Sequence, residues 1–134
     1  MKLNLTIVLL ACIATLSAQT VKVTNHYEIT PLTEQSAFCP VISPDGSKVI
    51  YTAHNFSGLK SYDLTTGEMK IITNADGAGF DPVFSLDGSM IYYRPQSRID
   101  GRVHRSLDEY NLNTQKTRQL IAPSRDIKRP IAIA

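Results

Sequence analysis

Short apolar runs alternate with turn signals along most of the chain. Four such runs follow one another, at residues 40–43, 48–53, 59–65 and 68–73. They are rich in β-branched and aromatic residues, and stretches containing glycine, proline or asparagine separate them. None shows the i, i+3, i+4, i+7 spacing of an amphipathic helix. The pattern therefore predicts four consecutive antiparallel strands in about forty residues, the size of one propeller blade.

The same pattern is then written a second time. Residues 40–51 read PVISPDGSKVIY and residues 82–93 read PVFSLDGSMIYY, so Asp45 and Asp87 stand 42 residues apart (87 − 45). In this second unit we predict strands at 82–85, 90–94, 106–113 and 116–121. A period of this size indicates a repeat architecture.

An Asp-Gly pair marks a predicted tight turn in each unit. Asp45 and Asp87 belong to a residue type that tolerates the corner of such a turn. Gly46 and Gly88 supply the left-handed position that a bulged hairpin requires. We therefore assign these four residues a structural role.

The second unit carries an additional stretch at 95–105, PQSRIDGRVHR, between its second and third predicted strands. Pro82 and Pro130 stand 48 residues apart (130 − 82), whereas Pro40 and Pro82 stand 42 apart (82 − 40). In repeat proteins such insertions map to loops on one face, which is often the binding face. We expect an inserted hairpin here.

Basic side chains gather in and beside this insertion. The candidate binding residues are Arg94, Arg98, Arg102, His104 and Arg105, together with His54 in the corresponding hairpin loop of the first unit. Arginine grips carboxylates and phosphates through paired hydrogen bonds. The alternative interpretation is a solvated, charged loop without a ligand, and both stay open at this point.

As a set, the Ser-Pro-Asp-Gly turn, the strand KVIYTA and the pair YDLTTG/EMKIIT resemble the TolB-type, WD-repeat-like β-propeller repeat. This repeat also occurs in the propeller domains of prolyl oligopeptidase family enzymes, and the resemblance covers about residues 28–134. It implies an all-β fold of four-stranded antiparallel blades. The expected parts are a leftover outer strand and linker at 19–39, blades at 40–81 and 82–127, and the start of a third blade at 128–134. Propellers close with about four to eight blades, so we expect missing blades or self-association to complete the ring.

Residues 1–18 read as a secretory signal peptide. Lys2 precedes the uncharged apolar run 5–16, and small residues follow, with cleavage expected after Ala18. We therefore expect export to the periplasm or beyond, without a membrane span after signal removal; lipid anchoring through Cys12 is the minor alternative. Cys39 then has no partner for an internal disulfide, and we expect it to be a small buried residue.

Motifs for catalysis are absent from the sequence. It contains no Gly-x-Ser-x-Gly, His-Glu-x-x-His or Cys-x-x-Cys, so we predict no catalytic residue, metal site or cofactor within it. With 14 basic against 12 acidic residues, no field that would attract nucleic acid is expected.

Two functional interpretations follow. The first is an exported, non-catalytic TolB-like propeller segment that binds another envelope protein or a peptide. The alternative is the propeller of a prolyl oligopeptidase-like serine peptidase whose catalytic domain lies outside these residues. A lyase site on further blades also stays open.

Overall fold

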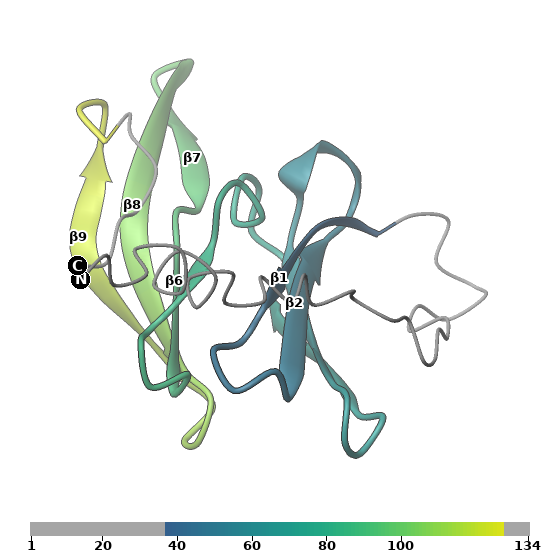
Figure 1. The fold of residues 1–134 in the computed structure, drawn as a ribbon. Coiled ribbons are helices and arrows are strands. Elements are labelled where there is room, and N and C mark those ends of the chain that lie inside the picture. Colours follow the sequence, from purple (N-terminus) through teal and green to yellow (C-terminus); the bar gives the residue numbers. More distant parts are fainter. Residues whose placement is uncertain (1–36, 128–134) are drawn as a thin grey trace, which may run out of the picture.

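Two antiparallel sheets stand side by side in the computed structural model, which describes residues 37–127 (Figure 1). The first sheet has the strand order β1-β2-β3-β4. Its strands are β1 (Phe38–Ile42), β2 (Lys48–Thr52), β3 (Leu59–Asp63) and β4 (Met69–Thr73). Each strand pairs with the next one in the chain, so the predicted four-stranded antiparallel blade is confirmed.

The second sheet repeats this arrangement with one extension. Its strands are β5 (Val83–Phe84), β6 (Met90–Tyr93), β7 (Gln96–Ile99), β8 (Arg102–Asn111) and β9 (Lys116–Ser124). The long strand β8 pairs with β7 through its first half and with β6 through its second half, while β9 lies along its other edge. The stretch 95–105 is thus no separate loop, because β7 and the start of β8 continue the sheet upward in Figure 1.

The two Asp-Gly turns are held by the same hydrogen bonds. Ser43 Oγ and Ser47 Oγ donate to the Asp45 carboxylate at 2.6 and 2.7 Å, and Ser85 Oγ donates to Asp87 at 2.5 Å. The glycine after each aspartate has a φ of +72°. Because these donors favour the ionised carboxylate, the pKa of Asp87 falls to about 2 and that of Asp45 falls well below its ordinary range.

The hydrophobic core lies between the two sheets. It is made by Ile50, Leu59, Ile72, Ala78, Phe84, Ile91, Tyr93 and Tyr110. Leu59 and Ile91 are fully buried. Since side chains alternate across a strand, each sheet directs one face at the other, as neighbouring propeller blades do.

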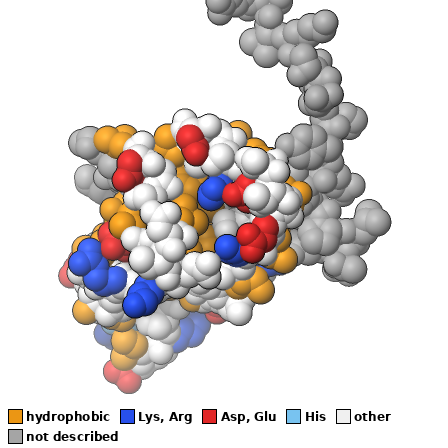
Figure 2. All heavy atoms as spheres, turned by 90° about the horizontal axis from the view of Figure 1, so that it is seen from below, with side chains coloured by type: hydrophobic (Ala, Val, Ile, Leu, Met, Phe, Trp, Pro, Cys, Tyr) orange, Lys and Arg blue, Asp and Glu red, His pale blue; other side chains and the backbone are white. Residues whose placement is uncertain are grey.

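The two ends of this pair of sheets differ in character. One end, which we call the turn end, carries the short turns that join β1 to β2, β3 to β4, β5 to β6 and β8 to β9 (Figure 1). Figure 2 shows this end from below, with acidic and basic side chains interspersed around hydrophobic ones. The opposite end carries the loop 53–58, the linker 74–82 and the hairpin formed by β7 and β8. We call it the loop end.

Several expectations concern residues beyond the described range. The signal peptide at 1–18 with Cys12, most of the leftover strand at 19–39, and the start of a third blade at 128–134 all lie outside residues 37–127. Within that range, no helix has the length and apolar character of a membrane span.

Candidate functional site

Three segments from both sheets meet at the loop end. The loop 53–58 contains a short 3₁₀ turn, η1 (His54–Phe56). The linker between the sheets is tied to it by a hydrogen bond from Gly79 N–H to the Phe56 carbonyl (3.2 Å). It is tied to β7 by a hydrogen bond from Gln96 N–H to the Asp76 carbonyl (2.8 Å). These backbone contacts fix the segments relative to one another.

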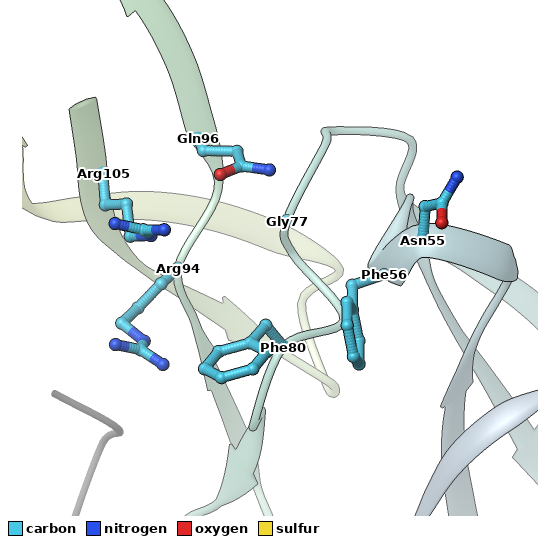
Figure 3. A pocket seen from close by; sticks show the side chains of 7 residues that line it. All are labelled: Asn55, Phe56, Gly77, Phe80, Arg94, Gln96 and Arg105. Carbon is cyan, nitrogen blue, oxygen red and sulfur yellow. The ribbon is translucent and has the colours of Figure 1, made fainter. Parts of the chain in front are cut away.

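A cavity of about 140 Å³ opens where these segments meet. Figure 3 shows its lining: Asn55, Phe56, Gly77, Phe80, Arg94, Gln96 and Arg105. Gln96 leans over Gly77, and a β-carbon built on that glycine would lie only 2.7 Å from the Gln96 Cγ. Gly77 also has a φ of +71°, so the close approach and the backbone conformation both favour glycine. We call this hollow the arginine cavity.

Two aromatic rings and a guanidinium group form one wall of the arginine cavity. The rings of Phe56 and Phe80 meet edge to face at a centroid distance of 5.2 Å. The Arg94 guanidinium carbon lies 5.4 Å from the Phe80 ring centroid, in cation–π contact. Arg94 is only 3% exposed, whereas Phe80 is 43% exposed. The wall therefore presents a partly exposed aromatic residue beside a cation.

Burial determines the electrostatics of this wall. Loss of solvent lowers the pKa of Arg94; the nearby Asp81 acts in the opposite direction, and the adjacent Arg105 lowers it further. Arginine nevertheless keeps its proton at neutral pH because its ordinary pKa is so high. Two neighbouring positive charges therefore line one partly dehydrated cavity, where a carboxylate or another anion would be attracted.

The pairing register divides the predicted basic cluster into two faces. Opposite residues of β7 and β8 share a face, which places Arg98 and Arg105 with Gln96 on the side of the arginine cavity. Arg102 and His104 point to the other side of the same hairpin.

The predicted residues consequently have different surroundings. Arg94 and Arg105 line the arginine cavity, whereas Arg98 is exposed and lines a neighbouring hollow that shares Gln96 with it. Arg102 is exposed on the opposite face and lines neither hollow.

The two histidines are not brought together. His54 lies in η1 with its ring 5.7 Å from that of Phe38. His104 lies within strand β8, with Nδ1 3.1 Å from the Arg102 carbonyl oxygen. The expectation that both occupy hairpin loops is wrong for His104, because the continued pairing of β7 and β8 turns that stretch into strand. Among residues 37–127, no three His, Cys, Asp or Glu side chains converge as metal ligands would.

Cys39 also differs from its expectation, since it is exposed rather than buried. It lies in β1, the edge strand of the first sheet, at an irregularity in the pairing with β2. Its φ of +50° turns the backbone out of the regular strand conformation.

Sequence reasoning missed the aromatic half of the site. Phe56 and Phe80 lie in connecting segments, where a single aromatic residue gives no periodic signal. The one available hint was the repeat itself, which aligns Phe80 with Phe38 at the 42-residue spacing (80 − 38). Both residues are partly exposed at the loop end.

Comparison with known proteins identifies the fold class. No family model matches the chain, and no curated protein matches it. Among solved structures, a tricorn protease superposes with a TM-score of 0.58 and 18% identity, covering 65% of this chain and 9% of its own. The acylaminoacyl peptidase of Pyrococcus horikoshii gives 0.54 and 16%, covering 66% of this chain and 18% of its own. TolB from Acinetobacter baumannii gives 0.49 and 23%, covering 63% of this chain and 21% of its own.

The chain thus spans about a fifth or less of the length of these proteins. At such identities the likeness establishes the fold and nothing further. Together with the four-stranded and the five-stranded antiparallel sheet, it confirms an all-β, partial β-propeller, with the arginine cavity between two neighbouring blades.

Proposed function

We propose that this chain is part of a binding propeller that holds an acidic segment of another envelope protein or a peptide at its loop end. The observation that carries the proposal is the convergence of Arg94 and Arg105 on one cavity beside the partly exposed Phe56 and Phe80. Loops on a rigid scaffold are the usual place for recognition, and fold alone names no ligand.

The chemistry of the arginine cavity favours a carboxylate. Two guanidinium groups offer forked donors that match the two oxygens of a carboxylate. Aromatic rings beside them favour contact with the carbon atoms of a peptide rather than with a bare ion. Among the residues that the structure describes, a hollow at the turn end is instead lined by charges of both signs, from Lys48, Lys70, Asp63 and Glu68.

The test compares two arginines of the same hairpin. The 134-residue chain is titrated against fluorescein-labelled Gly/Ser peptides of equal length that carry two Asp, two Asn or two Lys residues, and anisotropy is measured. We expect the Asp peptide to bind best, and Arg105→Glu to weaken it about tenfold or more. Arg102→Glu is the matched control, because it makes the same charge change on the opposite face.

Equal losses from the two substitutions would show general attraction to a basic protein rather than a site. No preference for the Asp peptide over the Lys peptide would refute the proposed function itself. Melting temperatures of both variants are measured alongside, so that unfolding is not mistaken for lost binding.

We also propose that the protein is exported, on the strength of Lys2 and the apolar run 5–16. Fusion of residues 1–40 to alkaline phosphatase, which is active only after export, tests this. Activity that disappears on Leu9→Arg supports a signal peptide, and an inactive unaltered fusion contradicts it.

A second candidate is the propeller of a serine peptidase. This candidate is suggested by the names of two of the matched structures, which are a protease and a peptidase. Reading the gene beyond the codon for Ala134 separates the candidates. A downstream Gly-x-Ser-x-Gly in a strand–turn–helix context would favour the peptidase.

A further inference from the structure

A second cavity lies directly beside the arginine cavity. Its volume is about 220 Å³, and it is lined by Phe38, Cys39, Ala53, His54, Asn55 and Phe56. Asn55 and Phe56 line both cavities, so the two hollows share a wall at the loop end. Apart from His54 and Asn55, the side chains of this second hollow are apolar or weakly polar. We call it the phenylalanine cavity.

The backbone around the phenylalanine cavity is strained. Cys39, Asn55 and Phe56 have φ values of +50°, +59° and +57°, in the left-handed region that residues other than glycine rarely adopt. Each such residue costs on the order of 1–3 kcal/mol, and such positions cluster at binding sites. Three of the six non-glycine residues with positive φ within residues 37–127 line this one cavity.

Large apolar side chains are also left open to solvent here. Phe38 keeps 42% of its surface exposed and Phe56 keeps 38%. Contiguous exposed aromatic surface beside a charged site is typical of a contact region for another molecule. The charge and the apolar surface occur next to each other, which gives a ligand two distinct anchoring points.

We propose that the two cavities together form one peptide groove. The carboxylate of a bound peptide lies between Arg94 and Arg105, and an apolar side chain of the same peptide fills the phenylalanine cavity against Phe38 and Phe56. This inference rests on the proposed function and adds its specificity: the ligand is an acidic peptide with a nearby apolar residue. The carboxylate can belong to an Asp or Glu side chain or to a chain terminus.

The experiment uses six short peptides and the 134-residue chain. The first three carry Asp alone, Leu alone, or both at a spacing of two residues, in a Gly/Ser background with an amidated end. The other three carry the same side chains and end in a free carboxylate. Affinities come from fluorescence anisotropy, and the amidated and free series distinguish a side-chain carboxylate from a terminal one.

The Leu-plus-carboxylate peptide should bind about tenfold more tightly than the peptide with the carboxylate alone, as partial burial of one leucine predicts. Phe38→Ala should abolish this gain and leave binding of the carboxylate-only peptide unchanged. Ile99→Ala is the matched control, because Ile99 is similarly exposed at 45% but lies on the far face of the hairpin.

Each outcome decides between the proposals. Equal affinities with and without leucine, or equal losses from Phe38→Ala and Ile99→Ala, would overturn the groove while leaving the arginine cavity as a carboxylate site. No binding of any acidic peptide would remove the proposed function and the groove with it. A Phe38→Ala chain with an unchanged melting temperature shows that the loss arises in the groove.

Discussion

Gly79 is the residue on which the geometry of the loop end depends most directly. A β-carbon built there would lie 2.0 Å from Thr52 Oγ1 and 2.2 Å from Thr52 Cβ. Thr52 cannot easily move, since it is only 1% exposed and its hydroxyl donates to the Gly58 carbonyl at 2.8 Å. In Gly79→Ala the linker must therefore shift away from β2, which breaks the hydrogen bond from Gly79 N–H to the Phe56 carbonyl.

The expected loss can be summed from these contacts. Overpacking costs about 1–3 kcal/mol, and a lost hydrogen bond costs about 1 kcal/mol, so Gly79→Ala should reduce the free energy of unfolding by about 2–4 kcal/mol. Urea denaturation followed by tyrosine fluorescence measures it. Gly101→Ala is the control: its glycine has a φ of +72° but no atom within 4 Å of an added β-carbon, so only about 1 kcal/mol of backbone strain is expected. A Gly79→Ala loss no larger than that of Gly101→Ala would refute the steric argument.

Three further predictions concern the core and the turns. Leu59→Ala, between the blades, should lower the free energy of unfolding by about 2–5 kcal/mol in urea denaturation. Ile42→Ala should lower it much less, because Ile42 is 63% exposed. Equal losses would contradict a core between the sheets. The pKa values of Asp63 and Asp87 are lowered to about 2 from 3.8. Their contribution to stability is therefore complete above pH 4 and is lost as the pH falls toward 2, which acid titration by circular dichroism checks; stability that rises over this interval would contradict the sign. Ser85→Ala removes the main donor to Asp87, so carboxyl NMR should show a higher pKa for that aspartate, and an unchanged value would contradict the assigned cause.

The blades could be predicted because their signals are local. Alternation with a period of two and the Asp-Gly turns at Gly46 and Gly88 are decided within a few residues. The sequence predicts an inserted hairpin at 95–105, but not that its strands β7 and β8 continue the second sheet. Pro95 and the Asp100-Gly101 pair are typical of loops and turns. In the structure, however, pairing along the full length of β8 makes most of this stretch β-strand.

The site was predicted only in part for a related reason. The sequence shows a cluster of arginines, but the side of the hairpin on which each one lies depends on the strand register. A register shift of one residue would move Arg102 to the opposite face of the hairpin. Phe56 and Phe80 reach the cavity because hydrogen bonds between distant segments position their loops. Such contacts leave no periodic trace in the sequence.

The most direct test of the account is to observe the arginine side chains themselves. The Nε–Hε signals of the labelled chain are recorded by NMR while a peptide carrying Asp and Leu is added. The account predicts that the signals of Arg94 and Arg105 move together and saturate, while that of Arg102 stays in place. Movement of Arg102 as large as that of Arg105, or no movement at Arg94 and Arg105, would contradict a carboxylate site between the two blades.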